Sequence, residues 1–166
     1  MKRILFILSL LFVATLNVKA QTPGVCKDSL RQPQPTYSCP VKYEPVCGCD
    51  GQTYRNKCNA ENRAGLLYST DGCCGNFDFD ITPNAVTYQL NLEIYKKTSG
   101  NVLITVFNTL GYREFEYQIF IPDAASVGGA YLFPLDLNYL GNGVFLLQVI
   151  SDGEQLVKKF YKYRTD

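Results

Sequence analysis

The side chains able to do chemistry in this sequence are mostly carboxylates and cysteines, because the chain contains no histidine. That absence excludes every catalytic triad with an imidazole base and every histidine-ligated metal site. Two carboxylate pairs, Asp78 with Asp80 and Glu114 with Glu116, could be imagined as general acid and base. Residues two apart on a strand share a face, so the simpler interpretation is a solvated strand surface. We therefore predict no enzyme, no cofactor and no small-molecule substrate.

The cysteines are confined to one segment. All seven lie between Cys26 and Cys74, and the remaining chain has none. The close pairs Cys47/Cys49 and Cys73/Cys74 raise the alternative of a zinc site, but their spacing is not the repeated C-x-x-C of zinc ribbons. A short exported segment cannot bury enough apolar surface to fold alone, so a disulfide scaffold without metal is predicted.

The N-terminus predicts export. Lys2 and Arg3 precede an apolar run from residue 4 to 16, and Val18-Lys19-Ala20 supplies a small-residue cleavage pattern. Residues 1–20 are therefore predicted to be a signal peptide, with Gln21 as the mature N-terminus. The alternative is a membrane anchor, but 13 apolar residues are too few to span about 30 Å of hydrocarbon. A net charge of +1 gives no basic field that would indicate nucleic acid.

The C-terminal half alternates apolar and polar residues in short runs. Seven candidate strands lie at residues 77–81, 88–94, 102–108, 112–121, 130–137, 143–151 and 155–163. Turn signals such as Gly141-Asn142-Gly143 and Asp152-Gly153 separate them. Short alternating strands with no amphipathic helix predict an all-β antiparallel, Ig-like sandwich over residues 77–166. The disulfide domain would then occupy residues 21–76.

The segment from Cys39 to Cys58 resembles the signature of Kazal-type serine protease inhibitors. Seven residues separate Cys39 from Cys47, and ten separate Cys47 from Cys58, as in that family. The residues that also sit at family positions are Tyr43, Pro45, Gly48, Asp50, Gly51, Thr53, Tyr54 and Asn56. The resemblance implies a small α+β knot, with a helix starting near residues 57–59, a three-stranded sheet and a reactive-site loop after Cys39.

One departure concerns the cysteines. The family usually has a cysteine two or three residues beyond Cys58, where this chain has Glu61 and Asn62, and Cys49 resembles its replacement. The resemblance then implies the disulfides Cys39–Cys58, Cys47–Cys74 and Cys26–Cys49, and it leaves Cys73 unassigned. Six cysteines allow 15 pairings, so spacing alone does not select this set.

The resemblance also implies a role for each loop residue. The loop comprises Pro40, Val41, Lys42, Tyr43 and Glu44, with support from Pro45, Tyr54 and Asn56. By family register the scissile bond is Val41–Lys42, and a valine suits a shallow apolar pocket of an elastase- or subtilisin-like protease. Tyr43 would pack on the leaving-group side.

Simpler interpretations stand beside these roles. Val41 could be an ordinary surface valine, while Tyr43 and Tyr54 could be packing residues. Lys42 stands where the family often has an acid, which weakens the inhibitory case. The alternative function is therefore a non-inhibitory Kazal module that serves as an extracellular binding or adhesion unit.

The tail resembles the C-terminal sorting domain of type IX secretion in Bacteroidetes. The resemblance rests on residues 81–85, on 102–111, on Leu135-Asp136-Leu137 and on the stretch from Leu140 to Phe160. It departs at Ala85, where a second proline is usual. The resemblance implies the type IX export machinery as a partner and a secreted or cell-surface location. A generic adhesion or carbohydrate-binding sandwich is the alternative.

Overall fold

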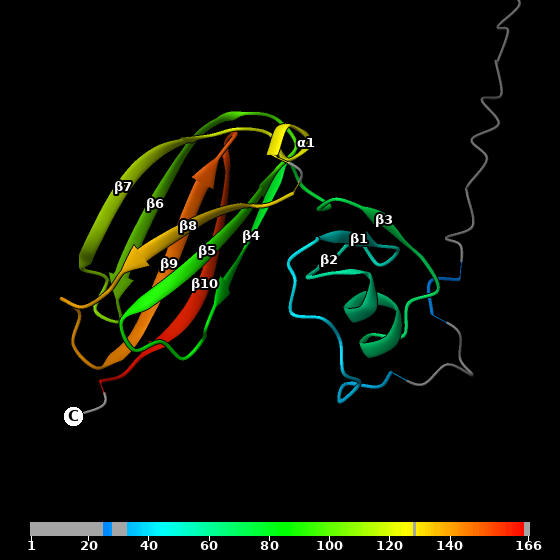
Figure 1. The fold of residues 1–166 in the computed structure, drawn as a ribbon, viewed down its shortest axis with the longest axis horizontal. Helices are drawn as coiled ribbons and strands as arrows, with labels where there is room; N and C mark the ends of the chain where they lie inside the picture. Colours follow the sequence, from blue (N-terminus) through cyan, green and yellow to red (C-terminus); the bar gives the residue numbers. More distant parts are fainter. Residues whose placement is uncertain (1–24, 28–32, 128, 165–166) are drawn as a thin grey trace, which may run out of the picture.

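The computed structural model describes residues 25–27, 33–127 and 129–164. The predicted signal peptide, residues 1–20, and Gln21 lie outside the described residues. Figure 1 shows a small part with short strands and a helical turn, followed by a larger part made of long strands. Within the described residues, no helix is long and apolar enough to cross a membrane.

The small part is built on a three-stranded antiparallel sheet in the order β2-β1-β3. Its elements are β1 (Val46–Gly48), β2 (Thr53–Tyr54), the π-helical turn η1 (Asn59–Arg63) and β3 (Ser69–Asp71). Helical geometry begins at Lys57, inside the range that the family resemblance implies. A core of Val46, Ala60 and Leu66 fixes the helix on the sheet. A Cβ on Gly48 would lie 2.5 Å from Leu66 Cδ1, so a glycine is needed for this close approach.

Three disulfides close the small part. They join Cys26 to Cys49, Cys39 to Cys58 and Cys47 to Cys74, with Cα–Cα distances of 5.4, 5.7 and 4.7 Å. These are the pairs that the family resemblance implies, and they fit a Kazal domain. Cys73 has no disulfide; its thiol is buried and donates a hydrogen bond to the Gly75 carbonyl at 3.2 Å. Burial raises the pKa of this thiol, which keeps it protonated and unreactive.

The larger part consists of two antiparallel sheets. Their orders are β10-β9-β6-β7 and β4-β5-β8. The strands are β4 (Phe77–Thr82), β5 (Gln89–Lys96), β6 (Gly100–Asn108), β7 (Arg113–Ile121), β8 (Tyr131–Asp136), β9 (Gly143–Ser151) and β10 (Glu154–Lys162). Each overlaps one of the seven predicted strands. A four-residue helix, α1 (Ala124–Val127), precedes β8 and was not predicted, because one turn is too short to show a helical period.

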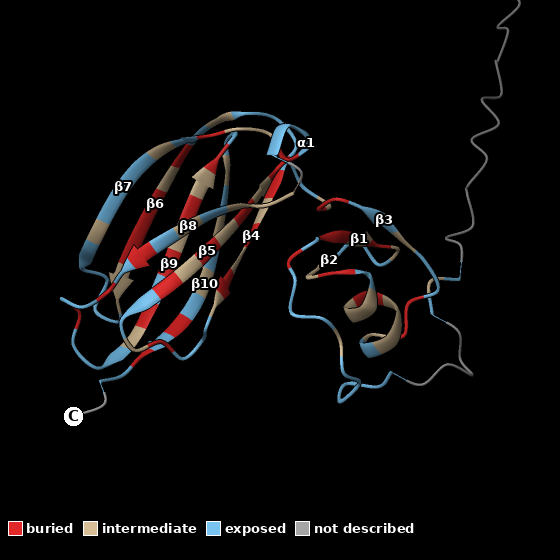
Figure 2. Cartoon of the chain, in the orientation of Figure 1, coloured by how far each residue is buried: buried red, intermediate tan, exposed pale blue. Residues whose placement is uncertain are grey.

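The two sheets share one hydrophobic core. Alternate residues point inward, as Figure 2 shows by the red bands along β4, β5, β6 and β9. In β4 these are Phe77, Phe79 and Ile81, each at most 6% exposed. Burial of one such side chain stabilises the fold by about 1.5–3 kcal/mol. Val86 exchanges backbone hydrogen bonds with Tyr161 and Tyr163, which ties the β4–β5 connection to β10.

The turn between β9 and β10 follows the prediction from sequence. Asp152 has φ of 52° and Gly153 has φ of 77°. Two consecutive positive φ values define the turn whose twist matches a two-residue hairpin, and Asp-Gly is a favoured pair for it. Ser151 and Glu154 are therefore paired directly across the hairpin.

Candidate reactive-site loop

The loop after Cys39 is anchored at its start and projects into solvent. The Cys39–Cys58 disulfide joins it to the helix, and Pro40 restricts the backbone before Val41. Val41 is 83% exposed, which leaves this apolar residue with little packing role. Lys42 and Glu44 form an ion pair at 2.5 Å, but both side chains are well exposed, so the pair adds little stability.

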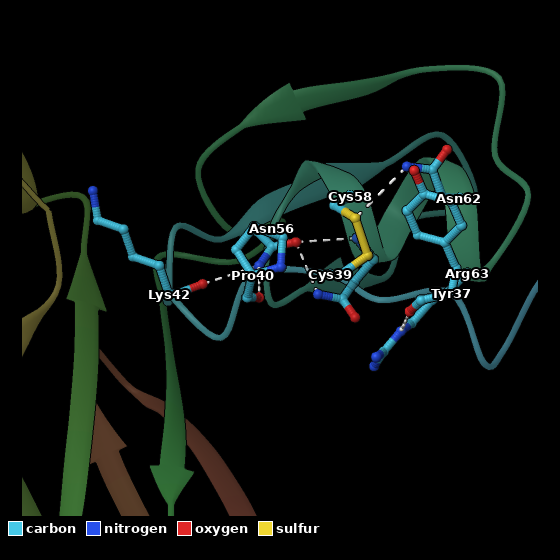
Figure 3. Close-up of a disulfide and its surroundings, with 9 residues drawn as sticks. Tyr37, Cys39, Pro40, Lys42, Asn56, Cys58, Asn62 and Arg63 are labelled. Atoms are coloured by element: carbon cyan, nitrogen blue, oxygen red, sulfur yellow. Dashed lines mark hydrogen bonds between the residues drawn. A yellow bond between two sulfur atoms is a disulfide. The ribbon is translucent and has the colours of Figure 1, made fainter.

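Asn56 holds the loop from behind. Its Nδ2 donates to the carbonyl oxygens of Pro40 at 2.9 Å and Lys42 at 3.0 Å, one on either side of Val41 (Figure 3). Its Oδ1 accepts hydrogen bonds from the backbone and side-chain nitrogens of Asn59. Asn56 is 7% exposed, so solvent competes weakly for these bonds. Both ends of one amide therefore connect the loop to the start of the helix.

The other predicted support residues lie close by. Pro45 is buried, and its carbonyl accepts from the Gly72 nitrogen at 2.8 Å, which fixes the exit of the loop to the end of β3. Tyr54 packs on the small core, and its hydroxyl donates to Asp50 at 2.7 Å. Burial is the larger cause and the hydrogen bond to Asp50 the smaller one of a rise in the pKa of Tyr54 to about 12. Tyr54 thus supports the turn at Asp50.

Tyr43 is not directed toward solvent. It is 4% exposed, and its hydroxyl donates to Asp78 of β4 at 2.8 Å. Burial, together with the Asp78 charge, raises the pKa of Tyr43 well above its usual range. Burial also raises the pKa of Asp78, against the opposing effects of the Lys158 charge and the Tyr43 hydroxyl. In the free chain Tyr43 therefore lies against the sheet that contains β4, and its contact with a protease stays a prediction.

Arg55 is a site residue that the sequence analysis missed. Its Nε donates to the Val41 carbonyl oxygen at 2.6 Å, and its two terminal nitrogens bind Asp80 and Glu93 of the larger part. The guanidinium carbon also lies 5.7 Å from the centre of the Tyr43 ring. The only sequence signal was its position beside Asn56.

The interpretation of Asp78 and Asp80 as solvated was wrong. Both are half-buried, and both are bonded to residues of the small part. The same interpretation does fit Glu114 and Glu116, whose side chains bind Asn108 and Arg113 at exposed positions. Within the described residues, no group of three acidic, cysteine or histidine side chains could hold a metal ion.

Comparison with known proteins decides the family. The profile of the Kazal-type serine protease inhibitor domain matches residues 26–74. An ovomucoid from Coturnix delegorguei is 53% identical over 52 residues, which cover 28% of this chain and 96% of that protein. The chain belongs to the Kazal-type serine protease inhibitor family. Trypsin inhibitor ClTI-1 from Gallus gallus is 37% identical over 57 residues, covering 31% of this chain and 96% of that protein.

The Kazal match is confined to the small part of the chain. Since the family and these relatives are named as inhibitors, the chain is not an enzyme. Among solved structures, the chain superposes on dimeric latent PorU from Porphyromonas gingivalis with a TM-score of 0.48 and 17% identity. That superposition covers 82% of this chain and 17% of the PorU chain, and a score of this size does not establish a shared fold.

Proposed function

We propose that the chain inhibits a serine protease through a rigid, substrate-like loop whose scissile bond is Val41–Lys42. The observation that carries the proposal is the Asn56 amide, which donates to the carbonyls on both sides of Val41. A flexible substrate loses conformational entropy when it binds. It is then cut, and its products leave. A loop already held in an extended conformation avoids most of that cost and stays in place after attack.

The specificity of this loop follows from Val41. A valine has no charge to pair with the aspartate of a trypsin-like pocket, and it is too small for a deep aromatic slot. We therefore propose an elastase- or subtilisin-like target. The ovomucoid and trypsin inhibitor relatives support inhibition as such, and the identity of Val41 supports the finer assignment.

The test uses residues 21–76, a segment with its own three disulfides and core. Inhibition of elastase, subtilisin, chymotrypsin and trypsin is measured with chromogenic peptides. Val41→Asp places an unpaired carboxylate in an apolar pocket and should weaken elastase inhibition on the order of 10³-fold or more. Val41→Lys should shift preference toward trypsin. Equal inhibition by Val41→Asp and the parent would exclude Val41 as the specificity residue.

We further propose that residues 77–166 form an Ig-like sandwich that acts as a sorting domain for the type IX export machinery. Its two sheets enclose a continuous core of their own, which supports a separately folded unit. A reporter enzyme carrying a signal peptide and residues 77–166 should reach the surface of a Bacteroidetes host. The matched control lacks Gly143–Asp166, which removes β9 from the middle of its sheet. Periplasmic retention of both fusions would contradict the proposal.

A further inference from the structure

The outward face of β4 and β5 carries two carboxylates in an unusual arrangement. Asp80 and Glu93 are paired directly across the two strands, and their side chains are 23% and 22% exposed. Like charges in such positions repel, and partial burial strengthens the repulsion. The pair is stabilised here because the Arg55 guanidinium binds both carboxylates, with Lys158 3.5 Å from Asp80 on the other side. This face is therefore a site for a guanidinium from the small part.

The same guanidinium covers the atom that a protease must reach. Arg55 Nε is 2.6 Å from the Val41 carbonyl oxygen, the carbonyl of the proposed scissile bond. A serine protease binds that oxygen with donors about 2.7–3.1 Å away. With Arg55 held at two further points by carboxylates, its rigid fork cannot move aside without breaking those bonds. The oxygen is thus already bound within the chain.

The leaving-group side of the loop is covered as well. Tyr43, two residues beyond Val41, is 4% exposed and is bonded to Asp78, whereas the Val41 side chain is 83% exposed. A protease contacts a substrate-like loop on both sides of the scissile bond. In this arrangement Val41 is accessible, but its carbonyl oxygen is already bonded to Arg55, and Tyr43, two residues further on, is buried.

We propose that the larger part of the chain holds the inhibitory loop closed, and that full inhibition requires Arg55 and Tyr43 to separate from Asp78, Asp80 and Glu93. This regulation rests on the proposed function of the loop. A closed fraction of about nine-tenths weakens the apparent affinity for a protease about tenfold, because only the open chain can bind. Removal of the larger part, or its displacement by a protease, opens the loop.

The test compares full-length chains. Asp80→Asn with Glu93→Gln removes the two charges that hold Arg55, and the matched control, Glu114→Gln with Glu116→Gln, removes two exposed charges on β7. Inhibition constants for elastase and subtilisin should fall about tenfold or more in the first variant and stay unchanged in the control. Amide hydrogen exchange of residues 41–44 without protease should become faster only in the first variant. Unchanged protection of β6 and β9 in the same measurement shows that the variant is folded.

Three outcomes would overturn the proposal, and each points to a different failure. Equal inhibition by the parent and the first variant would show that there is no closed form, while the inhibitory function would still stand. Weaker inhibition by the first variant means that Asp80 and Glu93 support the active loop. If the parent, the variant and residues 21–76 all fail to inhibit, the proposed inhibitory function is wrong, and the proposed regulation is wrong with it.

Discussion

At the scale of single residues, Asn56 has two separate roles in the loop region. Its two N–H groups point to the loop, and its oxygen points to Asn59 at the start of the helix. The two roles use different atoms of one amide, so a substitution can separate them. An aspartate keeps the oxygen acceptor and the size of the side chain but cannot donate.

The first prediction concerns this separation. Asn56→Asp in residues 21–76 should weaken protease inhibition about tenfold to a hundredfold, because two tethers of about 1 kcal/mol each are lost. The same variant should lose less free energy of unfolding than Asn56→Ala, since the Asn59 contacts remain. Asn56→Ala should lower both. Mass spectrometry during incubation with elastase should show faster cleavage at Val41–Lys42 in either variant.

If Asn56→Asp were cleaved no faster than the parent, the two hydrogen bonds would not control the lifetime of the loop. Denaturant unfolding of all three proteins provides the control, because it separates a weakened loop from a weakened fold.

At the scale of elements, the alternation of apolar and polar residues predicted the strands. Strand β5 shows where this pattern is informative and where it fails. Leu90, Leu92 and Ile94 are the apolar members of the alternating run, and all three lie in the core. The predicted strand ended at Ile94, because Lys96 continues the inward series with a charge. The lysine is buried and its Nζ binds Ser151 and Asp152 at the β9–β10 turn. A partner 56 residues away supplies the compensation, and a local pattern contains no information about it.

The second prediction follows from the unequal burial of this pair. The Lys96 side chain is 0% exposed, and the Asp152 side chain is 28% exposed. Asp152→Asn leaves a buried ammonium without its counter-charge, so it should cost about 3–5 kcal/mol of unfolding free energy. Asparagine tolerates the positive φ at this turn, so the loss would come from the charge. Lys96→Met removes the buried charge itself and should cost less, because Asp152 can turn to solvent.

Denaturant unfolding of the full chain measures this order, with Asp71→Asn as an exposed control of equal charge change. A larger loss for Lys96→Met than for Asp152→Asn would show that packing of the lysine stem, and not its charge, stabilises this end of β5.

At the scale of the whole molecule, the chain combines two cores of very different size. The small part has three buried residues in its core, whereas the larger part has 18. Only the first contains disulfides, which stabilise chiefly by restricting the unfolded chain. Cysteine density and strand alternation are the sequence features from which a division after residue 76 was predicted. The contact between the parts was not predictable, because acids on an alternating strand are usually solvated and Arg55 had no local partner.

The last prediction separates the two cores. Reduction of the full chain should unfold residues 26–74 and leave the two large sheets folded, since each lost disulfide costs about 3 kcal/mol and three buried residues cannot replace it. Without Arg55, the repulsion of Asp80 and Glu93 across β4 and β5 should cost the larger part only about 0.2–1 kcal/mol. Hydrogen exchange with mass spectrometry should therefore show protection lost before residue 75 and kept in β5, β6 and β9. An alkylated but unreduced chain is the control. Loss of protection in both parts together would mean that the contacts of Arg55 and Tyr43 join them into one cooperative unit, and the loop could then open only when the whole molecule unfolds.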